Sequence, residues 1–227
     1  MTVTYIRHSG FLVELARVCL LFDYWQGELP AIPAGKKLIV LASHRHRDHF
    51  TPDIFSLADG TRDVTFVLSS DIRAGRGRAD VIHVPPHTRI QVGETGIETL
   101  RSTDEGVAFI VRAEGRTIYH AGDLNLWSWP GEDEEENARM ETRYLRELDR
   151  IAGMRFDAAF VVLDPRQEED FDRGMASFLT RCCADHVFPM HMWQKPAVIA
   201  AFRRKHPELS SALEDVEAPG QTFFLTD

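Results

Sequence analysis

The sequence predicts an α/β protein (α+β in some schemes) in which β-sheets are covered on the outside by helices. Two observations carry this prediction. The first half is a succession of short β-rich segments, and the second half alternates segments of helical period with apolar strands. There is no internal repeat and no low-complexity linker, and 44% of the 227 residues are hydrophobic. We therefore expect one domain over residues 1–227, with a sizeable core.

The first half begins as a meander of hairpins. Three β-rich segments, residues 2–6, 11–15 and 18–22, are separated by short turns, and a loop rich in Pro and Gly follows. Residues 38–42 are a continuous apolar run, which is typical of a strand buried on both faces. Further elements are expected at 53–58 (a short helix), and at 65–68, 81–84, 88–92, 97–100, 107–112 and 117–120 (strands).

The second half changes character, and it begins with an acidic run at residues 131–137. Apolar residues then recur at helical spacing over 138–152, which predicts an amphipathic helix. The remaining expected elements are helices at 171–182 and 196–206, and strands at 158–163, 186–189 and 222–225.

Composition narrows the function classes. The net charge of −9 gives no general attraction to nucleic acid or to an anionic membrane. No apolar run is long enough to span a bilayer, and no secretory signal is visible at the first residues. Three cysteines, two of them adjacent, do not form a disulfide framework, and we expect them to be small buried side chains. These features together favour the cytoplasm.

The strongest chemical signal follows the strand at 38–42. Residues 44–49 read His-Arg-His-Arg-Asp-His, which places three imidazoles and a carboxylate within six residues. These are ligands that suit zinc, iron and manganese. In a tight loop His44 and His46 can converge on one point while Asp48 and His49 serve a second point nearby. The pattern therefore predicts a site for two metal ions.

Two later strands also end in metal-type ligands. The strand at 117–120 is followed by Ala-Gly and then Asp123, and an apolar strand at 186–189 leads to His191. A carboxylate at such a position is well placed to bridge two cations. Loops at strand ends carry functional groups on a rigid scaffold, so we expect all three elements to meet at one place.

These residues, taken in order along the chain, resemble the metallo-β-lactamase superfamily of hydrolases. The resemblance rests on the HxHxDH run, the Gly-Asp after a strand and the late histidine that follows a strand. The opening Tyr-Ile-Arg-His-Ser-Gly-Phe-Leu-Val-Glu of residues 5–14 and the Leu-Leu-Phe-Asp of residues 20–23 also resemble the ascorbate-6-phosphate-lactonase-like branch. The resemblance covers essentially the whole chain.

The resemblance implies a four-layer αβ/βα sandwich, the metallo-β-lactamase fold, with metals at the rim between two sheets. By position it implies His44 and His46 for the first metal, and Asp48, His49 and His191 for the second, with Asp123 bridging. It also implies that a water activated by the cations is the nucleophile, and we take Asp48 and Asp123 as the catalytic candidates.

One position departs from the family pattern. The first metal normally takes another histidine near residues 102–105, where this chain reads Ser-Thr-Asp-Glu. Asp104 is the nearest competent substitute; otherwise the first site binds metal weakly or stays empty. Zinc is the expected metal, as one or two ions, with manganese or iron as alternatives.

Four further residues are candidates for substrate contact or for orienting a ligand. His8 ends a strand and can orient a metal ligand, or be a hydrogen-bonded edge histidine. Asp164 and Arg166 follow a buried strand, and Arg166 can bind an anionic substrate or form a surface salt bridge. Trp127, just past Asp123, can form a pocket wall or anchor the following helix.

The expected function is therefore metal-dependent hydrolysis of a small molecule of ester, lactone or phosphoester type. Two alternatives stay open: a nuclease, and a non-catalytic metal-binding or sensor protein with a degenerate site. No nucleic-acid or membrane partner is expected, and a homo-oligomer is possible.

Overall fold

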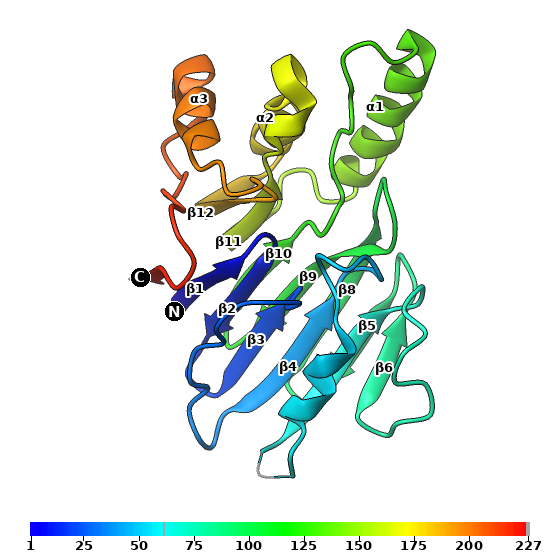
Figure 1. The fold of residues 1–227 in the computed structure, drawn as a ribbon, viewed down its shortest axis with the longest axis vertical. Helices are drawn as coiled ribbons and strands as arrows, with labels where there is room; N and C mark the ends of the chain where they lie inside the picture. Colours follow the sequence, from blue (N-terminus) through cyan, green and yellow to red (C-terminus); the bar gives the residue numbers. More distant parts are fainter. Residues whose placement is uncertain (61, 226–227) are drawn as a thin grey trace.

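Two β-sheets packed face to face form the centre of the molecule, and three helices lie beside one of them (Figure 1). The computed structural model describes residues 1–60 and 62–225. Residues 61, 226 and 227 of the expected domain lie outside the described residues. The sandwich of two sheets expected from the strand pattern is confirmed.

The first sheet has seven strands in the order β13-β1-β2-β3-β4-β5-β6. Pairing is antiparallel from β13 to β3 and parallel from β3 to β6. Its strands are β1 (Thr2–Arg7), β2 (Gly10–Glu14), β3 (Val18–Phe22), β4 (Lys37–Ala42), β5 (Val64–Ser69), β6 (Val81–Val84) and β13 (Thr222–Phe224).

The second sheet has six strands in the order β12-β11-β10-β9-β8-β7. Here β12, β11 and β10 run parallel, and β10 to β7 pair antiparallel. Its strands are β7 (Arg89–Val92), β8 (Thr95–Arg101), β9 (Val107–Ala113), β10 (Arg116–His120), β11 (Arg155–Val162) and β12 (Cys183–Met190).

Aromatic side chains fill the space between the sheets. Phe11 on β2 lies 4.5 Å from the ring of Phe160 on β11, and Phe22 on β3 lies 5.9 Å from the same ring. All three side chains are fully buried. Aromatic pairs at these distances add to the free energy of burying their large apolar area, so they hold the two sheets together.

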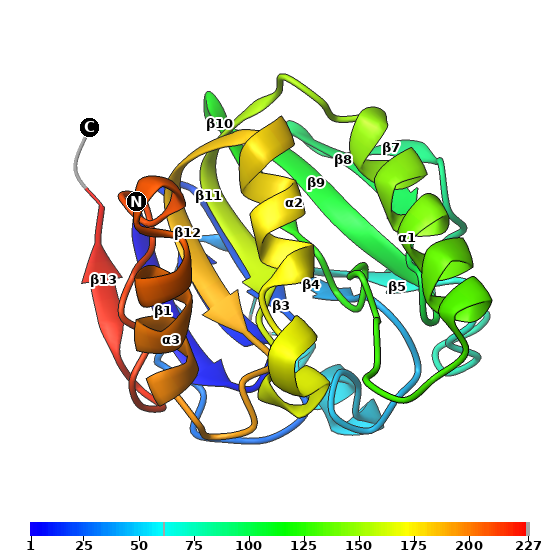
Figure 2. The same ribbon diagram turned by 90° about the horizontal axis from the view of Figure 1, so that it is seen from above.

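Helices cover the six-stranded sheet on its outer face (Figures 1 and 2). They are α1 (Glu134–Asp149), α2 (Arg173–Arg181) and α3 (Ala197–Lys205). Tyr119 of β10 stacks on Phe178 of α2 with the ring centroids 5.0 Å apart, and the Tyr144 hydroxyl of α1 donates to the Gly174 carbonyl at 2.9 Å. No helix of the described residues is long and apolar enough to cross a membrane.

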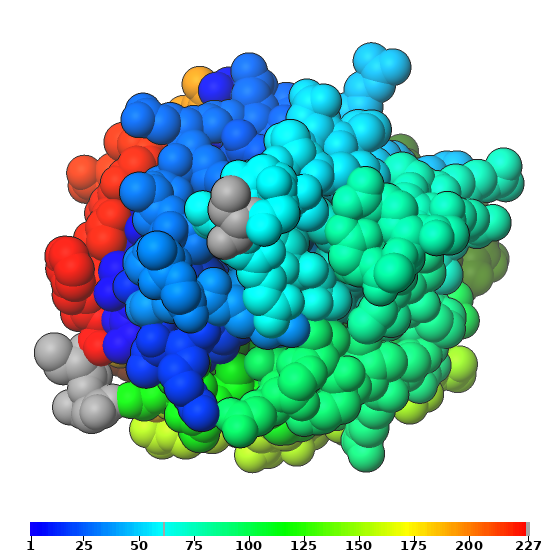
Figure 3. Space-filling model, turned by 90° about the horizontal axis from the view of Figure 1, so that it is seen from below, coloured from blue at the N-terminus to red at the C-terminus, as the bar shows by residue number. Residues whose placement is uncertain are grey.

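The outer face of the seven-stranded sheet has a thinner cover. A 3₁₀ helix, η1 (Pro52–Leu57), and loops pack there on a second apolar cluster that includes Leu38, Val40 and Phe66. Figure 3 shows this side of the molecule, formed mainly by the first half of the chain. The helical layers expected on both sides are therefore unequal, because α-helices cover one sheet and a short 3₁₀ helix with loops covers the other.

Several boundaries differ from the sequence prediction. The first α-helix starts at Glu134 and not at residue 138, because the Asp133 side chain accepts from the Glu135 N–H at 2.7 Å and caps it. Most of the acidic run thus forms the first turn of the helix, where negative charge is favourable. Residues expected to be a polar loop form η2 (Pro165–Asp170), and η3 (Pro207–Leu209) follows α3.

Strand β12 starts at Cys183, three residues earlier than predicted, because it pairs with β11 from Arg155↔Cys183 onward. This placement leaves Cys183 exposed, so the expectation of three buried cysteines is wrong for that residue. Cys19 and Cys182 are buried, and all three thiols are free.

One edge of the sandwich collects the carboxyl ends of seven strands. Strands β1, β3 and β4 run in one direction in the first sheet, as the antiparallel and parallel pairings require. Strands β8, β10, β11 and β12 likewise share a direction in the second sheet. Loops after these strands can therefore meet at a common rim.

Candidate metal centre

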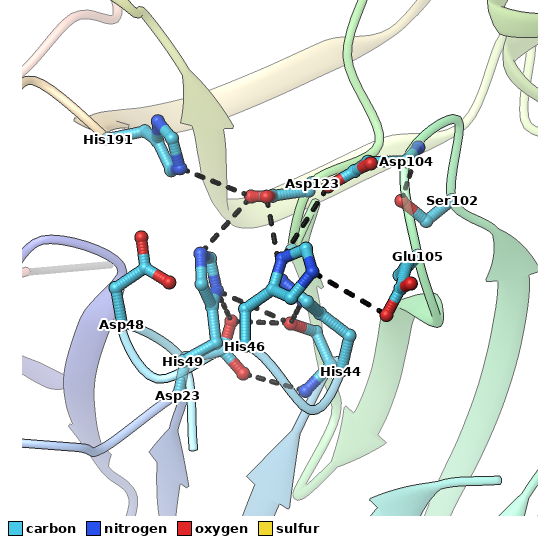
Figure 4. Close-up of polar contacts among 12 residues, drawn as sticks. Asp23, His44, His46, Asp48, His49, Ser102, Asp104, Glu105, Asp123 and His191 are labelled. Carbon is cyan, nitrogen blue, oxygen red and sulfur yellow. Dashed lines mark hydrogen bonds and ion pairs between the residues drawn. The ribbon is translucent and has the colours of Figure 1, made fainter. Parts of the chain in front are cut away.

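The predicted ligands meet at this rim (Figure 4). Each follows the end of a strand, so the two sheets and not the helices position them. His8 follows β1; His44, His46, Asp48 and His49 follow β4; Asp104 follows β8; Asp123 follows β10; and His191 follows β12.

The side chains form two groups, in each of which the potential ligand atoms lie within 4.8 Å of one another. The first group is His44, His46, Asp104 and Asp123, and the second is His8, Asp48, His49 and His191. This is the partition implied by the resemblance, with Asp104 in the place of the missing histidine and with His8 added to the second group.

Asp123 lies between the two groups. Its Oδ1 is 3.3 Å from His49 Nε2 and 3.5 Å from His191 Nε2, while its Oδ2 is 3.6 Å from His44 Nε2. The two carboxylate oxygens therefore face different groups. The side chain is 7% exposed, so its charge is poorly solvated without a cation.

The remaining close pairs are longer than good hydrogen bonds. His8 Nε2 lies 3.4 Å from Asp48 Oδ2, and His46 Nδ1 lies 3.7 Å from Asp104 Oδ2. Donor and acceptor pairs at such distances face each other without joining. An ion bound between the members of a pair can coordinate both the nitrogen and the oxygen.

The loop that carries the histidines is folded tightly. The N–H groups of His49 and Phe50 both donate to the His46 carbonyl at 3.0 Å. Arg45 points out of the site, where its guanidinium pairs with Glu105. This ion pair ties the histidine loop to the segment that bears Asp104.

Residues 102–106 lie directly against the histidine loop. The Val107 N–H donates to the Ser43 carbonyl at 2.9 Å. Gly106 has φ +73°, and a Cβ there would stand 2.0 Å from the Ser43 carbonyl oxygen. Only glycine fits this close approach, which sets Asp104 beside His46.

Two buried carboxylates hold the back of the site. Asp23, at the end of β3, lies 2.7 Å from His49 Nδ1 and also accepts from the Ser43 N–H and hydroxyl at 2.7 Å. Asp164, at the end of β11, lies 2.8 Å from His191 Nδ1. Carboxylates that hold the far nitrogen of a histidine fix the ring so that Nε2 faces the metal.

Four residues of the site other than glycine have backbone in the left-handed region. They are His8 (φ 56°), Asp23 (φ 42°), His191 (φ 65°) and Trp193 (φ 49°). The first three directly follow a strand and turn their side chains toward the rim. Residues other than glycine adopt this conformation at an energetic cost, and such residues cluster at functional sites.

The electrostatic environment shifts the pKa values of His44 and His49 in opposite directions. Burial, helped by the nearby His49, lowers the pKa of His44 to about 4, so His44 is neutral and offers a lone pair at neutral pH. Burial opposes a charge on His49 as well, but Asp123 and Asp23 outweigh it and raise the pKa of His49 to about 9. A proton on His49 thus balances carboxylates that a cation can neutralise.

The carboxylates respond to the same field. Burial disfavours charge on Asp23, yet His120 and the hydrogen bond from His49 outweigh it and hold the pKa of Asp23 at about 2. At Asp48 burial is likewise outweighed by His8 and His49, which lower the pKa. Burial and the charge of Asp123 raise the pKa of Asp104, and the nearby His46 and His49 offset this only in part.

Five buried ligand atoms test whether these residues fit a metal. They have no hydrogen-bond partner within residues 1–60 and 62–225, although buried polar atoms nearly always have one. They are His8 Nε2, His44 Nε2, His49 Nε2, His191 Nε2 and Asp123 Oδ1. All belong to the two groups, so the residues fit bound cations.

Other predicted residues have defined places. Trp127 is 8% exposed, donates from Nε1 to the Asp123 carbonyl at 3.0 Å and packs edge-on against His191. Trp127 thus holds Asp123 in place and also forms one wall of the site. Arg166 pairs with Asp164, the salt-bridge alternative of the prediction, and its guanidinium lies 4.3 Å from the ring centroid of Trp193.

Two site residues were not among the candidates. Asp23 ends the apolar strand β3, and an acidic residue directly after such a strand was the signal that could have found it. Trp193 donates to Asp164 at 3.2 Å and packs against His8, with the ring centroids 4.8 Å apart. No spacing rule in the sequence marks this tryptophan.

Fold and site together define a member of the β-lactamase superfamily, and the chain belongs to this family. Residues 2–136 match the family model described as a beta-lactamase superfamily domain. Among its relatives is a UPF0173 metal-dependent hydrolase of Opitutus terrae, 30% identical over 149 residues. The match covers 56% of this chain and 64% of the relative, just under two thirds of its length.

Solved structures share the fold, which confirms the predicted metallo-β-lactamase architecture. Igni18, a metallo hydrolase from Ignicoccus hospitalis, has a TM-score of 0.60 at 19% identity, with 99% of both chains covered. CmlA, a diiron beta-hydroxylase from Streptomyces venezuelae, has a TM-score of 0.68 at 14% identity, with 99% of this chain and 54% of that chain covered. At these identities the likeness is one of fold.

Proposed function

We propose that this protein is a metal-dependent hydrolase that uses water to cleave a small molecule of ester, lactone or phosphoester type. The observation that carries the proposal is the set of five buried, unpartnered ligand atoms aimed into one space. A buried imidazole or carboxylate without a partner is costly in a purely structural role. The cost is offset if these atoms coordinate cations.

The donor set indicates the metals. His8, Asp48, His49 and His191 give three nitrogens and one oxygen, which suits zinc. The first group has two histidines and two carboxylates, and this larger share of oxygen suits manganese or iron as well. Zinc, as one or two ions, is our first choice, and a diiron protein with the same fold keeps iron as the alternative.

Bound cations supply the chemistry by lowering the pKa of water and polarising the oxygen of the scissile bond. The protein's own groups do the rest. Asp48 has a side chain 31% exposed, so it lies at the mouth of the site and can accept a proton from water at its free oxygen. Asp123 is held in place by burial and by the hydrogen bond from Trp127, and it fixes the position of the two ligand groups relative to each other.

We assign substrate contacts to the open side of the second group. Trp193 is 41% exposed and stands beside His8 and Arg166. An aromatic ring and a guanidinium at the mouth can orient a small molecule that has an apolar and an anionic part. We further propose a cytoplasmic location, no nucleic-acid or membrane partner, and a possible homo-oligomer.

Metal analysis combined with a substrate panel tests the proposal. Purified protein is analysed by mass spectrometry for bound zinc, manganese and iron, and then assayed with a nitrophenyl ester, a lactone and a phosphodiester. We expect bound metal and turnover of at least one substrate. Asp48→Asn should bind metal more weakly, because it removes the one carboxylate of the second group, and should lose most turnover even with metal in excess, because its amide cannot accept the proton.

Asp63→Asn is the matched control, since Asp63 is exposed and pairs with Lys37 on the surface. It should behave as the wild type. Metal binding without turnover of any substrate would favour the sensor alternative, and cleavage of nucleic acid alone would favour the nuclease. Absence of bound metal after loading would overturn the proposal.

A further inference from the structure

A second pocket lies beside the metal centre, on the far side of residues 102–104. Its volume is about 390 Å³, and it opens between α1 and the loop that follows β8. Four arginines line it: Arg101 from the end of β8, Arg143 and Arg146 from α1, and Arg150 directly after the end of α1. Such a concentration of positive charge is unexpected in a chain with a net charge of −9.

The three helix arginines are placed on one face by their spacing. Residues 143, 146 and 150 are three and four positions apart, so they are neighbours on the helix surface. Like charges at this spacing destabilise a helix by about 0.2–0.5 kcal/mol per pair. Arg146 and Arg150 also lie at the C-terminal end of α1, where positive charge interacts favourably with the helix dipole and offsets this repulsion.

Few carboxylates neutralise these arginines. Arg101, Arg143 and Arg146 have no ion pair with any of the residues that the structure describes, and Arg150 lies 3.4 Å from Glu147. Four guanidinium groups thus face two lining carboxylates, Glu147 and Asp104.

Glu147 is itself already engaged. Its carboxylate bonds to His87 Nε2 at 2.9 Å and accepts from the Arg101 N–H at 3.1 Å. It therefore has little capacity left to neutralise the arginines. The pocket keeps an excess of positive charge in a concave place lined by exposed arginines, and a concave surface with one sign of charge attracts the opposite ion.

Asp104 connects the pocket with the metal centre. The residue lines the pocket and also belongs to the first ligand group, where it lies 3.7 Å from His46. The neighbouring Thr103 is fixed by the Asn125 N–H, which donates to its hydroxyl at 3.0 Å. A molecule at the metal site can thus reach the arginines past a single short segment.

The geometry points to an anion-binding pocket that takes a compact, multiply charged group, such as a phosphoryl group or a pair of carboxylates. Guanidinium groups bind these anions with paired hydrogen bonds. In its fullest form the inference rests on the proposed function, since the anion is then part of the substrate and lies remote from the bond that is cleaved. The same chemistry also fits a free anion that binds beside the site.

Titration of inorganic phosphate into the full chain tests the pocket independently of activity. Calorimetry is run on the metal-loaded protein and again after chelation, so that phosphate bound to metal is recognised separately. We expect the double variant Arg143→Gln/Arg146→Gln to bind phosphate at least about tenfold more weakly, because charge-assisted hydrogen bonds are lost. Arg143→Lys/Arg146→Lys should be intermediate, since charge remains but the paired geometry does not.

Arg139→Gln is the matched control. Arg139 lies on the same helix, four positions before Arg143, but pairs with Glu135 and Glu136 and does not line the pocket. Its variant should bind phosphate as the wild type does. Melting curves of all variants check that the fold is retained.

The source of the anion is resolved by kinetics with matched substrates, one neutral and one carrying a phosphate remote from the scissile bond. A raised KM for the charged substrate alone in the double variant supports a substrate-borne group. Phosphate binding that is lost in the double variant without any change in KM supports a free anion. Phosphate binding without hydrolysis of any substrate leaves the pocket standing and overturns only the proposed function.

Two results would overturn the pocket. One is equal phosphate binding by wild type and double variant after chelation, or no binding by either. The other is binding of a single-stranded oligonucleotide that depends on these arginines while phosphate does not bind, since the pocket would then be part of a nucleic-acid surface.

Discussion

Asp23 Oδ2 lies 2.7 Å from Nδ1 of His49, and both side chains are completely buried. The two residues come from the ends of neighbouring parallel strands, β3 and β4, so the sheet itself fixes their contact. Nδ1 donates to the carboxylate, which turns Nε2 of His49 toward Asp123. Asp23 therefore sets the orientation of the His49 ring from the side that faces away from Asp123.

Replacing Asp23 should weaken metal binding without removing a ligand. In Asp23→Asn the charge that orients His49 is lost, and loss of such a partner typically costs about 10–100-fold in metal affinity. Competition with a chromophoric chelator measures the affinity, and Asp63→Asn is the control. Unchanged affinity would show that Asp23 only fills space.

Asp123 and His49 should matter most for metal content. Asp123 faces both groups and His49 belongs to the second, so Asp123→Ala or His49→Ala should lose most bound metal and any activity. His44→Ala should cost less metal, because the second group remains complete. Elemental analysis of purified variants decides, and wild-type metal content in either of the first two variants contradicts the assignment.

Asp104 should influence which metal occupies the first group. An anionic oxygen beside His44 and His46 favours manganese or ferrous iron over zinc, and the added negative charge should make a bound water less acidic, so activity should rise toward higher pH. Asp104→His restores nitrogen and should raise zinc stoichiometry toward about two per chain. Unchanged stoichiometry, together with a structure in which Asp104 points away from His46, would refute this role.

Gly106→Ala should disturb the first group through the backbone. Its Cβ would stand 2.0 Å from the Ser43 carbonyl oxygen, so the segment bearing Asp104 has to move away from the histidine loop. Gly115→Ala is a matched control, because Gly115 has a similar φ of +79° but nothing within 4 Å. The control should lose only about 1–2 kcal/mol for its left-handed backbone. Thermal melts and metal counts should show a larger loss for Gly106→Ala, and equal losses would be evidence against the close approach.

Asp172 should make stability depend on pH. Burial opposes its charge, but hydrogen bonds from Lys205 at 2.7 Å and His206 at 2.6 Å outweigh this and lower the pKa of Asp172. A lowered folded pKa stabilises the protein above the unfolded value of about 3.9, and the stabilisation is lost as pH falls through the folded pKa. Asp172→Asn should therefore lose about 1.5–3 kcal/mol at pH 7 and nothing at acid pH.

Denaturant unfolding at several pH values measures this difference. The exposed Asp149, which lies 3.6 Å from Arg181, gives the control variant Asp149→Asn. A gap between wild type and Asp172→Asn that persists below the folded pKa would show that packing, and not charge, is responsible.

The rim of the site was the most predictable part of the molecule. Ligands such as His46 and Asp123 follow soon after the ends of β4 and β10. The end of a strand can be recognised in the sequence where burial on both faces requires continuous apolar residues, as in β4. Asp104 was found by its chemistry at the position where a ligand was missing. The two-sheet architecture followed from the same strands.

Long-range contacts were harder to predict. Trp193 reaches Asp164 and His8 only through the three-dimensional fold, and no local pattern encodes that meeting. The start of α1 was misplaced because the prediction followed apolar residues at helical spacing, whereas the first turn is acidic and is capped by Asp133. Coverage of the seven-stranded sheet by loops also had no periodic signal.

The left-handed backbone at His8, Asp23 and His191 has an evolutionary consequence. Glycine would adopt the backbone conformation of each of these positions with less strain. A selection for heat resistance alone would therefore favour replacing these residues. A library of variants chosen only for survival at high temperature should accordingly drift away from the metal ligands first, and sequencing it would map the site without any knowledge of the substrate.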